Sequence, residues 1–137
     1  MRFLLALLVT IGIATPAAAF TEADRAAAQS SIEQQLDAFL ADDGAAAYSF
    51  AAPSIQAMFP TQEIFMELVR RGYPPVYRSR SHSFGELKET ATGLEQIVDI
   101  VDAEGEFWTA RYTLELQPDG SWRITSCTLL KKPGEVA

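Results

Sequence analysis

Apolar residues recur along this chain with two different periods, first helical and then strand-like. Thr21 and Asp24 form a weak capping box at the start of the first helical segment. Asp42-Asp43-Gly44 ends that segment, and we expect Gly44 to adopt the left-handed C-cap conformation. One apolar stripe between these ends follows the spacing i, i+4, i+7 and i+8 of a helix face: Ile32, Leu36, Phe39 and Leu40.

Three shorter helical segments are predicted after the first helix. Residues 45–50 form one with Asp43 as its N-cap, and residues 54–59 add a further turn after a proline. That turn is expected to direct three side chains inward: Ile55, Met58 and Phe59. Thr61 caps the last segment, which ends at Gly72. Its expected core stripe has four members: Ile64, Phe65, Leu68 and Val69.

The period changes to two from residue 76 onward, which predicts strands. Pro74 and Pro75 argue against helix just before this point, because each proline favours extended backbone in the residue before it. We expect four strands: 76–84, about 94–102, 107–116 and 121–130. Helices followed by an antiparallel meander predict an α+β domain, with the N-terminal helices packed against one face of the sheet.

The N-terminal residues have the pattern of a signal peptide. Arg2 precedes an apolar run over residues 3–13, which is shorter than the roughly 20 residues that span a bilayer. Small residues follow, so we expect cleavage after Ala19 and a periplasmic or secreted product that does not contact the membrane. An uncleaved anchor is the alternative. The remainder is predicted to be one domain over residues 20–131 with a mobile tail over 132–137.

Composition narrows the classes of function. The formal net charge of −7 argues against nucleic-acid binding, which needs clustered basic residues. The single cysteine, Cys127, excludes an intramolecular disulfide; we expect a buried free thiol, with intermolecular pairing as the alternative. With His82 as the only histidine, no zinc-type cluster is possible, and we expect neither a metal nor a cofactor.

Arg78, Arg80 and His82 form a row at strand spacing. This row could provide a cationic wall for an anionic ligand. The alternative, which we favour, is a set of cross-strand ion pairs, with Arg78 opposite Asp99 and His82 opposite Glu95.

Aromatic side chains are the second candidate feature. Most should be core, but several around one cavity would suit a small, partly apolar ligand. Asp99 and Asp102 could serve in acid–base chemistry if either faced an apolar pocket. No catalytic signature is present, so no catalytic residue is assigned. The candidate pocket residues are Tyr48, Phe59, Tyr73, Tyr77, Arg78, Arg80, His82, Trp108, Tyr112 and Trp122.

Two sets of segments carry a family resemblance. The order Ile32–Asp43, Ala45–Ala51 and the closing hairpin Trp108–Ile124 resembles the nuclear transport factor 2-like superfamily, also called SnoaL-like or cystatin-like cones. More narrowly, one uncharacterised proteobacterial family, domain of unknown function 4864, is similar in three places: Phe50–Ile55, Tyr73–Arg78 and Cys127.

The resemblance implies a curved sheet wrapped around the helices, with an open end that forms a pocket. Such pockets serve isomerases, cyclases and dehydratases, and also non-catalytic binding domains. We expect a non-catalytic domain that binds a small molecule or peptide. The first alternative is an isomerase-, cyclase- or dehydratase-like enzyme that uses Tyr77 or His82 with an inward aspartate. The second is an envelope interaction module that uses the outer sheet face, with a homodimer as one form.

Overall fold

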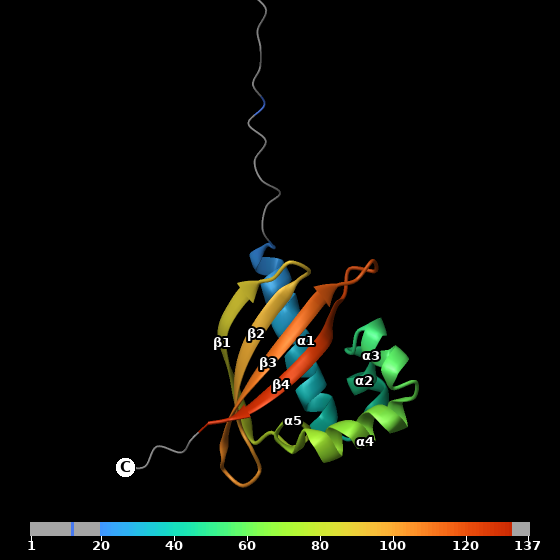
Figure 1. Ribbon diagram of the computed structural model, residues 1–137, viewed down its shortest axis with the longest axis vertical. Helices are drawn as coiled ribbons and strands as arrows, with labels where there is room; N and C mark the ends of the chain where they lie inside the picture. Colours follow the sequence, from blue (N-terminus) through green and yellow to red (C-terminus); the bar gives the residue numbers. More distant parts are fainter. Residues whose placement is uncertain (1–11, 13–19, 133–137) are drawn as a thin grey trace, which may run out of the picture.

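The computed structural model describes residue 12 and residues 20–132, in which the helices precede the strands (Figure 1). The helices are α1 (Glu22–Leu40), α2 (Gly44–Ser49), α3 (Pro53–Met58), α4 (Gln62–Gly72) and α5 (Pro74–Tyr77). The strands are β1 (Ser81–Glu89), β2 (Leu94–Val101), β3 (Phe107–Leu116) and β4 (Trp122–Lys131). They form one antiparallel sheet in the order β1-β2-β3-β4. The predicted α+β architecture, helices first and then a four-stranded antiparallel sheet, is confirmed.

Both predicted terminal segments fall mainly outside the described residues. The predicted signal peptide over residues 1–19 is outside them except for residue 12. Of the predicted mobile tail only Lys132 is described, and it is held in place: its backbone N–H donates to the Phe107 carbonyl at 2.9 Å. Among the described residues, no helix has the length and apolar character needed to cross a membrane.

The longest helix, α1, lies across one face of the sheet (Figure 1). Its N-terminus has the predicted capping box: the Thr21 hydroxyl accepts from the Asp24 N–H, and the Asp24 carboxylate accepts from the Thr21 N–H. Ile32 and Phe39 of the predicted stripe are buried. Leu40 is not, with 48% of its surface exposed, because it closes the helix about 100° around the axis from Phe39.

The connection from α1 to α2 differs from the prediction in one residue. Asp42, not Gly44, takes the left-handed conformation, with φ of 53°. Aspartate tolerates this region better than most residues, and the Asp42 carboxylate is held there by two partners described below. Gly44 instead begins α2, and Asp43 is its N-cap as predicted, accepting from the Ala46 N–H at 3.1 Å.

The first strand begins later than predicted, because Pro74 and Pro75 start a short helix. Proline suits the first positions of a helix, where its missing N–H has no intrahelical partner to lose. The two prolines occupy those positions in α5, so the expected strand over residues 76–84 was wrong at its start. β1 then runs on to Glu89, with a register shift between Phe84 and Leu87.

The hydrophobic core lies between α1 and the inward faces of β2, β3 and β4. Alternate residues of β2 point inward, and Leu94, Val98 and Ile100 are all buried. Helices α2, α3 and α4 gather beside β4, where Phe65 and Val69 of α4 are buried (Figure 1).

Two apolar residues predicted to lie inward are largely exposed, although Met58 lines the pocket described below. Ile64 is 49% exposed and Met58 is 63% exposed. Ile64 precedes Phe65 by one residue, so it points about 100° away from the face of α4 that packs inward. Met58 is the last residue of α3, a short helix in which no residue is buried.

Candidate ligand pocket

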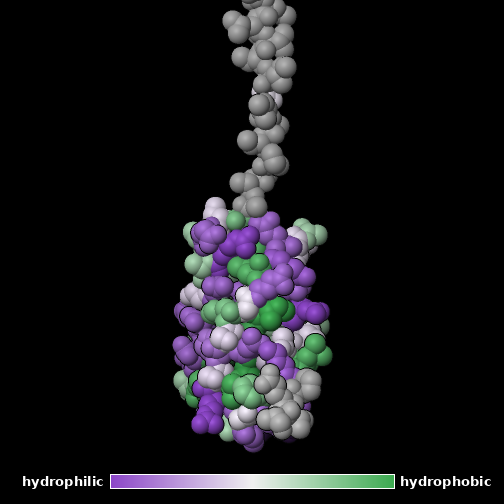
Figure 2. Space-filling view, turned by 90° about the vertical axis from the view of Figure 1, so that its left-hand side faces the viewer, coloured by the Kyte–Doolittle hydropathy of each residue, from purple (hydrophilic) through white to green (hydrophobic). Residues whose placement is uncertain are grey.

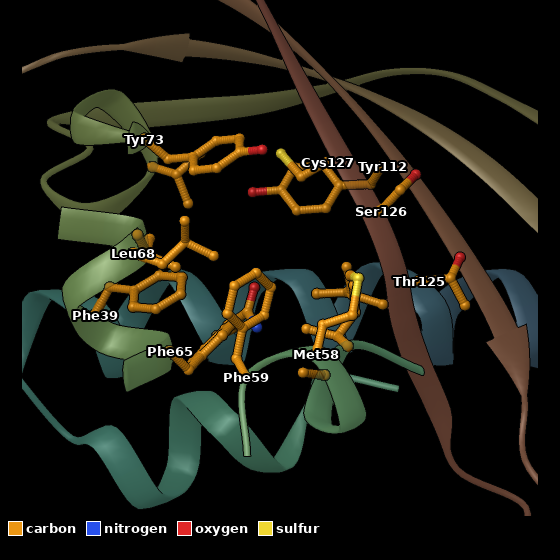
Figure 3. A pocket seen from close by; sticks show the side chains of 16 residues that line it. Phe39, Met58, Phe59, Phe65, Leu68, Tyr73, Tyr112, Thr125, Ser126 and Cys127 are labelled. Carbon is orange, nitrogen blue, oxygen red and sulfur yellow. The ribbon is translucent and has the colours of Figure 1, made fainter. Parts of the chain in front are cut away.

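A cavity of about 320 Å³ opens between α3 and α4 on one side and β3 and β4 on the other (Figure 3). This volume is at the lower end of the range for small-molecule sites. Its lining is mostly apolar and includes the aromatic rings of Phe39, Phe59 and Phe65. No side chain in the lining carries a formal charge. The cavity therefore suits a neutral, small molecule better than an ion.

Helix α4 forms one wall through its period of 3.6 residues. Phe65, Leu68 and Val69 recur at i, i+3 and i+4, so they share one face and all line the cavity. This wall matches three of the four residues in the stripe that the sequence predicts for α4.

A β-bulge forms the opposite wall. Thr113 pairs with Ser126, but Leu114 pairs with Ile124, which leaves Thr125 as the extra residue on β4. In a regular strand, neighbours point to opposite faces. The bulge interrupts that alternation, and Ile124, Thr125, Ser126 and Cys127 all line the pocket. The sequence contains no glycine or proline in this segment that would have signalled the bulge.

Three polar groups meet at one end of the pocket: the hydroxyls of Tyr73 and Tyr112 and the thiol of Cys127 (Figure 3). We name these groups the polar end. Tyr112 and Cys127 are directly opposite each other on β3 and β4, and Tyr73 reaches them from the end of α4. The Tyr112 side chain is 1% exposed, and its hydroxyl has no hydrogen-bond partner of adequate geometry among the described residues. The Cys127 thiol interacts with this hydroxyl, but thiols form only weak hydrogen bonds.

Two groups of the polar end, Tyr112 and Cys127, are uncharged at neutral pH. Burial raises the pKa of the Tyr112 hydroxyl well above its ordinary value of 10.0. Burial also raises the pKa of the Cys127 thiol to about 12, although the neighbouring Tyr112 hydroxyl opposes this shift. Both groups therefore stay protonated. Because the thiolate is the nucleophilic form, the raised pKa makes Cys127 a poor nucleophile. Cys127 is a free thiol as predicted, but it is only partly buried.

Tyr48, a predicted pocket residue, lies behind the wall and supports it. Its hydroxyl donates to the Phe59 carbonyl at 2.5 Å and to the Gln56 carbonyl at 3.2 Å. The Gln56 amide donates in return to the Tyr48 carbonyl at 3.0 Å. These bonds fasten the α3 turn to α2 and so hold Phe59 at the pocket.

Tyr77 and Arg78 fasten the end of α1 to α5. The Tyr77 hydroxyl donates to the Asp42 carboxylate, and Arg78 Nη2 lies 2.7 Å from Asp42 Oδ1 and 2.9 Å from Oδ2. Arg78 Nη1 also donates to the Phe39 carbonyl at 2.6 Å. The hydrogen bond from Tyr77, and then that from Arg78, lowers the pKa of Asp42. The predicted pairing of Arg78 with Asp99 was therefore wrong, and neither Tyr77 nor Arg78 lines the pocket.

His82 pairs in the sheet with Ile100 and not with the predicted Glu95. Its Nε2 lies 3.5 Å from Glu33 Oε1 on α1. The register differs because β1 begins at Ser81, after a helix that the sequence pattern did not reveal. His82 borders a smaller hollow of about 200 Å³ on another part of the sheet.

Arg80 lies in the loop before β1 and is exposed. Its backbone N–H donates to the Val101 carbonyl at 2.8 Å. Asp99, the other predicted partner in this region, pairs with Lys132 at 2.6 Å between Nζ and Oδ1. The row is thus divided among the C-cap of α5, a loop and β1, so it forms no cationic wall.

The two tryptophans bind carboxylates outside the pocket. Trp108 Nε1 donates to Asp102 Oδ2 at 2.9 Å, and Trp122 Nε1 lies 3.4 Å from Asp24 Oδ1. The Asp102 carboxylate also accepts from the backbone N–H groups of Glu104 and Glu106. These bonds, first that from Trp108, lower the pKa of Asp102, so it stays ionised and stabilises the turn between β2 and β3.

Of the ten predicted pocket residues, the structure places three in the lining: Phe59, Tyr73 and Tyr112. No histidine, carboxylate or other charged side chain joins them there. Among the described residues, no group of three or more histidine, cysteine, aspartate or glutamate side chains is arranged to hold a metal ion. The pocket presents hydrogen-bonding groups and apolar surface, but no acid–base pair.

The surface on the β1 side of the molecule is mixed. Figure 2 shows hydrophobic residues there in small groups separated by hydrophilic ones. The interaction module that uses the outer sheet face stays a prediction.

Comparison with known proteins identifies one family. A family model described as "Domain of unknown function (DUF4864)" matches residues 21–137. No curated protein and no solved structure matches the chain closely enough to count as a relative. The match spans the complete helix-and-sheet domain, including every residue of the pocket.

Proposed function

The chain belongs to the DUF4864 family, and from that premise we propose that it is an exported, non-catalytic domain that binds a small, largely apolar molecule. The ligand occupies the pocket between α3, α4 and β4. The observation that carries this proposal is the Tyr112 hydroxyl, which is buried at the end of an open, uncharged cavity and has no hydrogen-bond partner of adequate geometry among the described residues. Nearly all buried polar groups in native proteins are hydrogen-bonded, and one that is not costs about 1–3 kcal/mol. A bound ligand would supply the missing partner.

The composition of the lining supports binding rather than catalysis. An efficient general acid or base has a pKa near the operating pH and lies beside the reacting group. Asp42 and Asp102 both have lowered pKa values and lie outside the lining. The acid–base set of the enzymatic alternative therefore does not meet in this pocket.

Two finer features belong to the same proposal. Residues 1–19 act as a signal peptide that delivers the domain to the periplasm or the exterior. The sheet and helices form a nuclear transport factor 2-like cone, which the order of elements and the pocket between helices and sheet support. Expression of the complete chain in a bacterial host tests the first feature: the exported product should begin at Phe20. A cytoplasmic product that retains Met1 would contradict export.

The binding site is tested with a variant that fills the pocket. Leu68→Trp places a larger ring in the cavity from α4, whereas Ile64→Trp adds the same ring to an exposed position of the same helix. The ¹³C-methyl NMR signals of Met58 and Val69 report on ligands during a titration with small neutral compounds. We expect the signals to shift in the wild type and in Ile64→Trp, and to stay unchanged in a folded Leu68→Trp. Equal binding by all three proteins would show that the ligand site is elsewhere.

A further inference from the structure

The polar end also indicates the chemical class of the ligand. Resting on the function proposed above, we propose that the ligand is a neutral molecule whose carbonyl-type oxygen accepts a hydrogen bond from the Tyr112 hydroxyl. The remainder of the ligand is apolar and contacts the aromatic and aliphatic walls formed by α4 and Phe59. Tyr112 and Tyr73 are thus specificity-determining residues of the pocket.

The group that the polar end lacks is an acceptor. The Tyr112 hydroxyl is buried and has an O–H to donate, yet it makes no hydrogen bond of adequate geometry with a described residue. The Tyr73 hydroxyl points to the same place, beside Cys127 (Figure 3). Each phenol oxygen can accept as well as donate, so it is the unpaired Tyr112 O–H that selects an acceptor: an orphaned buried donor is rarer in proteins than an acceptor with an unfilled lone pair. A carbonyl oxygen has two lone pairs and no proton, so it complements this arrangement.

The lining also argues that the ligand is neutral. A buried carboxylate or ammonium group needs a counter-charge, and the lining contains none. The acidic chain, with a formal net charge of −7, adds no general attraction for anions.

The aromatic rings do not provide a cage for a cation either. Phe65 packs against the rings of Phe39 and Tyr48, at centroid distances of 6.0 and 5.5 Å. Phe39 packs in turn against Tyr77 at 5.9 Å. The rings are therefore engaged with one another, whereas a cation needs several open aromatic faces directed at one point.

The cavity volume limits the size of the ligand. At about 320 Å³, the pocket is near the lower limit for small-molecule sites, so it fits one ring with a short substituent or a short aliphatic chain.

A matched series of phenylalkyl compounds tests the acceptor and the charge separately. Benzylacetone is neutral and carries a ketone, and butylbenzene has a similar shape without an acceptor. Hydrocinnamate replaces the methyl ketone with a carboxylate, and phenylpropylammonium carries a positive charge. Dissociation constants are measured by NMR titration at neutral pH on the exported protein, and the Val69 methyl signals show whether a compound enters the pocket.

Wild-type protein should bind benzylacetone more tightly than butylbenzene and both ions. Tyr112→Phe should weaken the binding of benzylacetone about 2- to 12-fold, the range for loss of one hydrogen bond. The same substitution should leave the binding of butylbenzene unchanged or make it tighter. Tyr77→Phe is the matched control: it removes a hydroxyl that donates to Asp42 outside the lining and should leave the ratio of the two constants unchanged.

The possible failures are distinguishable. If butylbenzene binds as tightly as benzylacetone and Tyr112→Phe affects both equally, the acceptor proposal is wrong while the pocket remains a binding site. If hydrocinnamate or phenylpropylammonium binds tightest, the ligand class is charged and the neutrality argument is wrong. If none of the four compounds shifts the Val69 methyl signals at millimolar concentration, the binding function itself is contradicted.

Discussion

Replacement of Tyr112 by phenylalanine should stabilise the ligand-free protein, although Tyr→Phe changes in a core usually destabilise. The substitution keeps the ring, which packs in the core, and removes only a hydroxyl that lacks an adequate partner. Tyr48→Phe is the opposite case, because that hydroxyl donates to two backbone carbonyls. The two variants make the same chemical change in two phenols of the same domain, one unsatisfied and one satisfied.

The size of the effect follows from the burial of the hydroxyl. An unsatisfied buried hydroxyl costs about 1–3 kcal/mol, and the weak interaction with the Cys127 thiol offsets part of this cost. We therefore expect Tyr112→Phe to raise the free energy of unfolding by about 1 kcal/mol, which corresponds to a rise in Tm of about 4 °C for a domain of this size. Tyr48→Phe should lower the free energy of unfolding by about 0.5–1.5 kcal/mol, the net value of a hydrogen bond.

Urea and thermal unfolding followed by circular dichroism measure both changes. Mass spectrometry under native conditions must first show that the samples carry no ligand, since a bound ligand stabilises the wild type by mass action. A Tm for Tyr112→Phe that falls as far as the Tm for Tyr48→Phe would refute the reasoning, because it would show that the Tyr112 hydroxyl has a good partner. The expected result would instead mean that the Tyr112 hydroxyl lowers the stability of the ligand-free protein while remaining free to bind a ligand.

Three further predictions concern other parts of the fold. Because the pKa of the Cys127 thiol is raised from 9.0 to about 12, the thiol should react with a disulfide reagent far more slowly in folded than in urea-unfolded protein. For the same reason, the contribution of the protonated thiol to the free energy of unfolding should be complete below pH 9 and lost between pH 9 and 12. Gly93→Ala would place a methyl group 2.0 Å from a carbonyl oxygen of β3 and should cost about 1–3 kcal/mol by urea unfolding, whereas Gly72→Ala, which meets open space, should change stability by less than about 0.5 kcal/mol. Asp42→Asn should lower Tm at neutral pH, and the difference from wild type should vanish as pH falls through the pKa that the Tyr77 hydrogen bond depresses; a difference that persists in acid would contradict that role.

Elements with a long or clear hydrophobic period were predictable from the chain alone. The capping box at Thr21 and the stripe through Ile32 defined α1, and strict alternation defined β3 over residues 107–116. These features depend on contacts within a few residues, where intrinsic conformational preferences and side-chain direction dominate. The same local reasoning gave the α+β class, because a meander of half-buried strands needs helices to cover one face.

Local reasoning was wrong at Pro74 and Pro75, where two structures fit the same residues. Proline disfavours helix in the residue before it and also suits the first turn of a helix. The choice between a strand and α5 was made by tertiary contacts: Tyr77 and Arg78 reach Asp42 only when that turn is helical and brings them to the end of α1. The predicted row of Arg78, Arg80 and His82 was wrong for the same reason, because it required a strand that begins before Ser81.

The sequence by itself therefore determined the class of the domain, its acidic surface and most of its elements. Only the tertiary structure decided which residues form the pocket. Tyr73, Tyr112 and Cys127 are far apart in the chain, and they meet because the β3–β4 register and the bulge at Thr125 turn consecutive β4 residues toward α4. A bulge at this position depends on how β4 pairs and packs, not on a turn-forming residue, so no local pattern revealed it.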